Sequence, residues 1–102
     1  MIRQDDQPDL SLIIPAYNEA QRLRPSLEKI LAYLRACDFR AEVVIVDDGS
    51  SDGTGELARE VLEGQTAYRI LRHEPNRGKA LSVKRGLLEG HGRYLLFSDA
   101  DL

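Results

Sequence analysis

Stretches of continuous apolar residues alternate along the chain with stretches in which apolar residues recur at helical spacing. Residues 10–15 read LSLIIP, and residues 43–46 read VVIV. Unbroken apolar runs of this length are typical of strands that are covered on both faces. Shorter runs at 68–71 and 93–98 predict two further strands. We expect Pro15 to end the first strand, because proline has no N–H to give to the ladder.

Three helices are predicted between these strands. The first carries an apolar stripe with the 3.6-residue period of a helix, formed by Leu23, Leu27, Ile30, Leu31 and Leu34. We expect Pro25 in its first turn, where a missing N–H costs nothing. The second helix follows the turn cluster at 49–54, ends at Gly64, and is predicted to bury Leu57, Ala58, Val61 and Leu62. The third is expected over 79–88.

This order of elements predicts an α/β fold. Parallel strands joined by helices have right-handed crossovers, which places helices on both faces of the sheet. We therefore predict a three-layer α/β/α open parallel sheet of the Rossmann-like kind over residues 10–102. The polar residues 1–9 are expected to be a disordered lead-in.

Composition narrows the class of protein. The chain has 102 residues, of which 42% are hydrophobic and 30% are charged, so one folded domain is expected. Its net charge of −3 offers no basic footprint for nucleic acid. A single cysteine, Cys37, excludes an internal disulfide or a cysteine-based zinc site. No apolar run approaches the roughly 20 residues of a membrane span, and we expect a cytoplasmic setting.

Polar residues follow three of the strands at the point where each strand ends. The segments are AYNE at 16–19, DDGS at 47–50 and DAD at 99–101. The carboxyl ends of parallel strands meet at one edge of the sheet, where ligands of such folds bind. Asp99 and Asp101 can share one partner, because side chains at i and i+2 of an extended segment point the same way. Clustered carboxylates suit a hard cation, Mg²⁺ or Mn²⁺, although an acidic turn remains the alternative.

Other polar residues have two interpretations each. Asp47 and Asp48 could form a turn or cap a helix, or accept hydrogen bonds from a ribose or a base. Tyr17 is expected in an exposed loop, with its ring available for stacking. The segment Asn76-Arg-Gly-Lys79 is not a Walker A motif, but a glycine loop that opens a helix can meet phosphates through its N–H groups and Lys79. The two histidines, His73 and His91, are expected at the surface or at a helix end.

Four motifs together carry a resemblance to a known family. They are SLIIPAYNE at 11–19, VDDGSSDGT at 46–54, NRGK at 76–79 and DAD at 99–101. In this order the chain resembles the nucleotide-binding half of a family 2, GT-A-fold glycosyltransferase. The runs NEAQRL and GKALSVKRG make it most similar to the polyprenyl (dolichyl)-phosphate glucosyltransferases.

The resemblance implies a strand order of 3-2-1-4 and a role for each motif residue. Donor-binding positions would be Pro15, Ala16, Tyr17, Glu19, Asp47, Asp48, Lys79, Asp99 and Ala100. Asp47 and Asp48 would hold the base and ribose, with their roles left open. Asp99 and Asp101 would be the catalytic and metal-binding pair, with Mg²⁺ or Mn²⁺ bridging the diphosphate.

The implied activity is inverting transfer of glucose from UDP-glucose to a polyprenyl or dolichyl phosphate, in the cytoplasm or at the cytoplasmic face of a membrane. The family pattern continues beyond DAD, so we expect a truncated piece that is itself inactive. Alternatives are another family 2 transferase, using GDP-mannose or building polysaccharide, and a non-catalytic receiver-like module. The strand at 93–98 would lie at a sheet edge, and we expect it to drive self-association.

Overall fold

The computed structural model describes residues 7–100 and contains the seven elements that the sequence predicts. The four strands are parallel and lie in the order β3-β2-β1-β4, which confirms the predicted topology. In chain order the elements are β1 (Leu10–Ala16), α1 (Ala20–Arg35), β2 (Ala41–Asp47), α2 (Thr54–Leu62), β3 (Ala67–Arg72), α3 (Lys79–Glu89) and β4 (Tyr94–Phe97).

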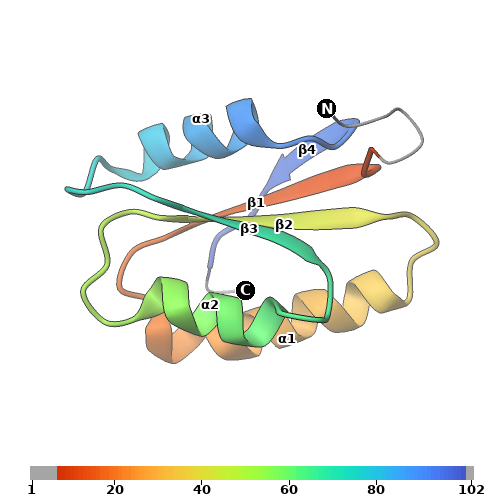
Figure 1. The fold of residues 1–102 in the computed structure, drawn as a ribbon, viewed down its shortest axis with the longest axis horizontal. Helices are drawn as coiled ribbons and strands as arrows, with labels where there is room; N and C mark the ends of the chain where they lie inside the picture. Colours follow the sequence, from red (N-terminus) through yellow and green to blue (C-terminus); the bar gives the residue numbers. More distant parts are fainter. Residues whose placement is uncertain (1–6, 101–102) are drawn as a thin grey trace.

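The sheet separates two apolar layers. Helices α1 and α2 cover one face and α3 covers the other (Figure 1). Successive residues of β1 therefore face different layers: Ile14 packs with α1 and α2, whereas Ile13 belongs to the cluster on the α3 side. Because both layers need apolar side chains, the strand sequence is continuously apolar rather than alternating. The predicted α/β/α arrangement is confirmed.

Strand β1 continues past Pro15, contrary to the expectation that this residue ends it. Pro15 pairs with Val46 in the parallel ladder with β2. The Ser98 N–H donates to the Ile13 carbonyl, so the backbone polar groups of residues 13 and 15 point toward β4. Strand β4 has already ended at Phe97. The missing N–H of Pro15 therefore removes no bond from the sheet.

Helix α1 begins earlier than the position of Pro25 suggests. It starts at Ala20, which places Pro25 in the second turn rather than the first. Pro25 cannot donate to the Gln21 carbonyl, but both residues lie on the exposed side of the helix, where water can satisfy that group. The apolar stripe, by contrast, is buried toward the sheet as predicted.

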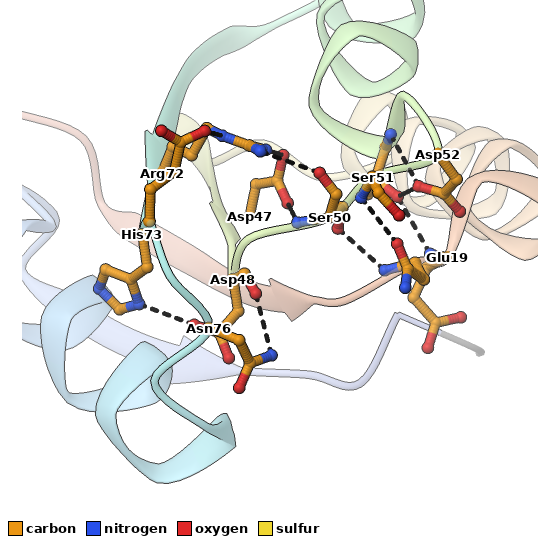
Figure 2. A network of polar contacts seen from close by, with 12 residues as sticks. Glu19, Asp47, Asp48, Ser50, Ser51, Asp52, Arg72, His73 and Asn76 are labelled. Atoms are coloured by element: carbon orange, nitrogen blue, oxygen red, sulfur yellow. Dashed lines mark hydrogen bonds and ion pairs between the residues drawn. The ribbon is translucent and has the colours of Figure 1, made fainter.

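The start of α1 is fixed by a loop more than 30 residues away in sequence. Asp52 accepts from the Ala20 N–H at 3.1 Å, and the Thr54 hydroxyl accepts from the Glu19 N–H at 3.0 Å. The Ser50 hydroxyl accepts from the Asn18 N–H at 2.9 Å (Figure 2). These bonds satisfy backbone donors that a helix start leaves without an intrahelical partner. The loop after β2 therefore sets where α1 begins.

Helix α3 packs directly on the sheet at Gly86. An added Cβ at Gly86 would lie 2.2 Å from Ile13 Cγ2 and 3.3 Å from Val46 Cγ2. Neither neighbour can give way easily, because both are fully buried in the strands. Glycine at position 86 thus lets the helix rest on the central strands.

The amino ends of β1 and β2 hold the connection between α3 and β4. The buried carboxylate of Glu42 accepts from the Ser11 hydroxyl at 2.5 Å and from the His91 N–H at 2.6 Å. The Gly92 N–H donates to Ser11 Oγ at 2.7 Å. The side chain of His91 is largely exposed, as expected. A buried acceptor thereby ties β4 to the body of the sheet.

Two further observations concern the ends of the described chain. Pro8 and Asp9, predicted to be part of a disordered lead-in, are hydrogen-bonded: the Asp9 N–H donates to Arg40 O, and Asp9 O accepts from the Tyr94 N–H. At the other end, the side chains of β4 are all exposed at the sheet edge, as the sequence predicts.

Within residues 7–100, no helix is both long and apolar enough to cross a membrane.

We predict that Glu42→Ala lowers the free energy of unfolding by about 1–3 kcal/mol, because it leaves the Ser11 hydroxyl and the His91 N–H without their buried acceptor. Urea-induced unfolding measures the loss. The control is Glu28→Ala, which removes an exposed carboxylate from α1 and should change little. Equal effects of the two substitutions would contradict the role given to Glu42.

We predict that Asp52→Ala lowers the free energy of unfolding by about 1 kcal/mol at pH 7, the usual cost of a lost helix cap. Burial tends to raise the pKa of Asp52, but hydrogen bonds from the Thr54 hydroxyl and the Ala20 N–H outweigh it and hold the pKa below its usual range. A lowered pKa gives a contribution that is present above about pH 4 and is lost as the pH falls further.

The difference between wild type and Asp52→Ala should therefore narrow below about pH 4. Unfolding is followed at pH 7 and pH 3, with Asp38→Ala, at an exposed turn, as the control. A difference that is the same size at both pH values would show that the carboxylate charge does not stabilise the cap.

Candidate functional site

The carboxyl ends of the strands and the start of α3 enclose a pocket of about 420 Å³. Its walls come from the end of β1, the loop after β2, the loop before α3 and the segment after β4. The lining residues are Pro15, Ala16, Tyr17, Glu19, Asp48, Asn76, Gly78, Lys79, Ser82, Asp99 and Ala100. Every donor-binding residue proposed from sequence is among them except Asp47. Asp101 lies outside the described residues.

Tyr17 and Glu19 form the β1 wall of the pocket. The Tyr17 side chain follows the end of the strand and is 50% exposed, as expected for a ring in a loop. Glu19 is more enclosed, with 18% of its side chain exposed. Its Oε2 atom is buried and lies 3.0 Å from an Arg22 guanidinium nitrogen, and among residues 7–100 no donor meets it in hydrogen-bond geometry. Glu19 therefore brings to the pocket wall a carboxylate that is ion-paired with Arg22.

Asp47 is bound to the protein rather than turned to the pocket. Its Oδ1 accepts from the Ser50 N–H at 3.0 Å, and its Oδ2 accepts from Arg72 Nη1 at 2.6 Å (Figure 2). Arg72 also donates to the Ser50 carbonyl at 2.9 Å. The sequence left open which of the two aspartates holds the base or the ribose. The structure places Asp47 as an anchor between the loop after β2 and the end of β3, and a donor-binding role for it stays a prediction.

Asp48 lines the pocket and is almost fully buried. Its Oδ1 accepts from the Arg77 N–H at 2.8 Å and lies 2.9 Å from His73 Nδ1, while its Oδ2 accepts from the Gly78 N–H at 2.8 Å. Burial tends to raise the pKa of Asp48, but the hydrogen bonds from Arg77, His73 and Gly78 outweigh it and hold the pKa below its usual range. Asp48 is therefore a carboxylate, and an acceptor only, at neutral pH.

His73 contacts the pocket residue Asp48 without lining the pocket itself, a position that the sequence did not predict. It was expected at the surface, yet its side chain is only 8% exposed and contacts Asp48 (Figure 2). No local pattern marks this contact, because the two residues are 25 positions apart and follow different strands. Ser82 was also missed; it lies one turn into α3, where its hydroxyl donates to the Gly78 carbonyl at 3.1 Å.

The far wall of the pocket carries one negatively charged and one positively charged side chain. Lys79, the first residue of α3, donates to Asp99 Oδ1, and both side chains are more than half exposed. Within residues 7–100, no three His, Cys, Asp or Glu side chains are close enough together to form a metal site. The structure places Asp99 at this wall, and a metal-binding role for Asp99 and Asp101 stays a prediction.

The site is thus an open pocket that combines an exposed aromatic ring, three carboxylates of which Asp48 is buried, a helix start and a lysine. Its floor is the edge of a parallel sheet at which α/β proteins bind ligands. N–H groups at a helix start and a lysine suit anionic groups. The ring suits the face of a base, and the carboxylates suit hydroxyl or N–H donors.

The chain is similar in sequence to known glucosyltransferases. It is 42% identical to a dolichyl-phosphate beta-glucosyltransferase of Drosophila melanogaster and 38% identical to that of Saccharomyces cerevisiae. Each match covers 95% of this chain but only 32% and 31% of the relative. The chain therefore spans about a third of the length of these curated relatives.

Solved structures agree with these matches. The mannosyltransferase PcManGT from Pyrobaculum calidifontis, solved with GDP-Man and Mn²⁺, is 32% identical with a TM-score of 0.74, over 93% of this chain and 28% of its own. TarS from S. aureus, solved with UDP, is 27% identical with a TM-score of 0.81, over 91% of this chain and 27% of its own.

The model of the family described as glycosyl transferase family 2 matches residues 11–102, nearly the whole chain. The matched region contains all four motifs on which the resemblance was based, and the fold has the strand order that the resemblance implies. The chain belongs to glycosyl transferase family 2.

Proposed function

We propose that this chain forms the nucleotide-sugar-binding part of an inverting glycosyltransferase that moves glucose from UDP-glucose to a polyprenyl or dolichyl phosphate. The observation that carries the proposal is the pocket, which gathers Tyr17, Glu19, Asp48, Lys79 and Asp99 at the carboxyl edge of the sheet. The names of the matched relatives supply the sugar and the acceptor.

In this proposal each wall of the pocket meets one part of the donor. The Tyr17 ring stacks on the base, an interaction worth about 1–3 kcal/mol in nucleic-acid sites. Glu19, which is ion-paired with Arg22 at the pocket wall, accepts from a ribose hydroxyl. The N–H groups at the start of α3 and the Lys79 ammonium face the diphosphate.

The residues at the end of β4 fit a divalent cation in their chemistry. Asp99 presents carboxylate oxygens at the pocket wall, which are the ligands that Mg²⁺ and Mn²⁺ prefer. Mg²⁺ or Mn²⁺, held by Asp99 and Asp101, would neutralise charge on the leaving diphosphate. In the free protein Lys79 donates to Asp99, so a bound cation and Lys79 would share this carboxylate.

The reaction that follows is a single displacement. A phosphate oxygen of the acceptor forms the new bond to the sugar C1 as the bond from C1 to the diphosphate breaks, which inverts the anomeric carbon. The acceptor phosphate is already an anion, so it needs no strong base. A lipid-linked acceptor and a cytosolic nucleotide sugar together place this activity, in our proposal, at the cytoplasmic face of a membrane.

The test of the donor is thermal unfolding of this chain with UDP, UDP-glucose and GDP-mannose, with and without Mn²⁺ or Mg²⁺. We expect UDP and UDP-glucose to stabilise the fold only when the metal is present, by about 2.7 kcal/mol at a hundredfold excess over Kd. Asp101→Asn halves the negative charge of the Asp99 and Asp101 pair. It should therefore abolish the metal-dependent part of the stabilisation by nucleotide.

Two outcomes would contradict the proposal. Equal stabilisation by GDP-mannose would overturn the preference for uridine, and stabilisation by no nucleotide would overturn the donor site itself. The exposed substitution Tyr33→Ala on α1 is the matched control for loss of a tyrosine, to be compared with Tyr17→Ala. Only the change at Tyr17 should weaken nucleotide binding.

We also propose that the chain self-associates through β4. The strand lies at the sheet edge, and its four residues, Tyr-Leu-Leu-Phe, are exposed and include no charge or proline that would discourage pairing. Light scattering should show dimers or larger species whose fraction rises with concentration. Leu95→Lys should reduce that fraction, whereas Tyr33→Lys on α1 should not. A clean monomer at high concentration would refute the proposal.

A further inference from the structure

His73 is a buried titratable residue that the proposed function does not use. It directly follows β3, and its backbone N–H donates to the Asp47 carbonyl at 2.9 Å, which extends the ladder between β2 and β3 by one residue. Its side chain is 8% exposed, and Nδ1 lies 2.9 Å from Asp48 Oδ1, the one polar contact of this ring within residues 7–100. The ring is therefore held rigidly, with one nitrogen directed at a pocket residue.

The proton on this ring can be assigned from its partner. Asp48 is ionised at neutral pH, because the hydrogen bonds that it accepts outweigh its burial and lower its pKa. An ionised carboxylate can only accept hydrogen bonds. The contact of 2.9 Å therefore requires a proton on Nδ1 of His73, whatever the state of Nε2.

The same carboxylate holds the loop that opens α3. Its two oxygens accept the N–H groups of Arg77 and Gly78, each at 2.8 Å. The Asn76 amide donates to the Asp48 carbonyl at 3.0 Å. The loops are also packed tightly, since an added Cβ at Gly49 would lie 2.9 Å from the Asn76 nitrogen. Asp48 thus holds residues 76–78 in place, Asn76 through its backbone carbonyl and Arg77 and Gly78 through its carboxylate.

The loop at 76–78 positions the cationic wall of the pocket, which is formed by Gly78 and Lys79. Gly78 precedes the first helical residue, Lys79, and both line the pocket. A rotation of the Asp48 carboxylate would release the Arg77 and Gly78 N–H groups together, and with them the start of α3. His73 is the side chain that opposes such a rotation, because it donates to Oδ1 from the side of β3.

We propose that His73 is a positioning residue for the diphosphate of the donor: through its Nδ1–H it fixes Asp48, and Asp48 fixes the 76–78 loop and the start of α3. The inference rests on the proposed nucleotide-sugar site. It adds a residue that makes no contact with the ligand yet controls how the phosphate-facing wall is held.

Two substitutions separate this role from simple packing. The side-chain amide of His73→Asn can place an N–H donor near the position of Nδ1, whereas that of His73→Gln places it nearer Nε2. Both remove ring volume from the same buried position, so both should lower the melting temperature. We expect only His73→Gln to change phosphate recognition.

The readout is the ratio of the affinities for UDP and for uridine, measured by calorimetry on this chain with Mn²⁺. In the wild type the ratio reports what the diphosphate adds. We expect it to fall about tenfold in His73→Gln, a difference of about 1.4 kcal/mol, and to stay near the wild-type value in His73→Asn. His91→Asn is the control for loss of a histidine, because its side chain is exposed and lies away from the pocket.

An unchanged ratio in His73→Gln, or an equal fall in both variants, would overturn the inference. If the variants do not fold, the ¹⁵N chemical shifts of the wild-type imidazole decide it: a proton on Nδ1 is expected, and its absence would refute the proposal. Failure of UDP to bind the wild type with Mn²⁺ would instead overturn the proposed function, so the two failures are distinguishable.

Discussion

The buried carboxylate of Asp48 is the contact on which the shape of the pocket depends. It stands at the end of the central strand pair and accepts from three donors that belong to the end of β3 and to the loop before α3. A buried charge is costly unless it is fully hydrogen-bonded. The segments that supply its donors are therefore held together, and the loop before α3 gains a defined position without regular secondary structure of its own.

The opposite wall is held in a similar way by a different loop. Residues 50–54 supply the oxygens that accept the backbone N–H groups of residues 18–20. Tyr17 and Glu19 follow β1 in the sequence. Their segment is nevertheless held in place by side chains of the loop that follows β2. Two walls of the pocket are thus fixed by contacts between loops that the sheet brings near one another.

Much of the fold could be predicted, because its cause is local and repeated. The apolar run at 43–46 belongs to a strand that is covered on both faces, and the apolar stripe of α1 belongs to a helix with one buried face. Each pattern can be recognised within a short stretch of sequence. The motif residues could be assigned to one edge, because strands of a parallel sheet end at the same side. For residues 10–100, the elements and the parallel sheet follow from these two rules, whereas the strand order was implied by the family resemblance.

The wrong predictions for Pro15, Pro25 and His73 have a common physical origin, which is contact between residues that are far apart in the sequence. Pro15 is tolerated inside β1 because its neighbour β4 has already ended, and Pro25 lies in the second turn of α1 because distant oxygens cap the helix earlier. His73 is buried because Asp48 needs a donor. In each case the deciding partner lies on another element, which no pattern within one element reveals.

The tight packing of α3 on the sheet at Gly86 has a consequence for chimeras made between related proteins. The helix touches the sheet where Ile13 projects, and no room exists for a methyl group between them. A chimera that receives α3 from another protein, with a larger residue at this position, would therefore also need a smaller residue at position 13. Transplanted together, helix and strand form a single exchangeable unit; transplanted separately, they would be incompatible, however well their pocket residues matched.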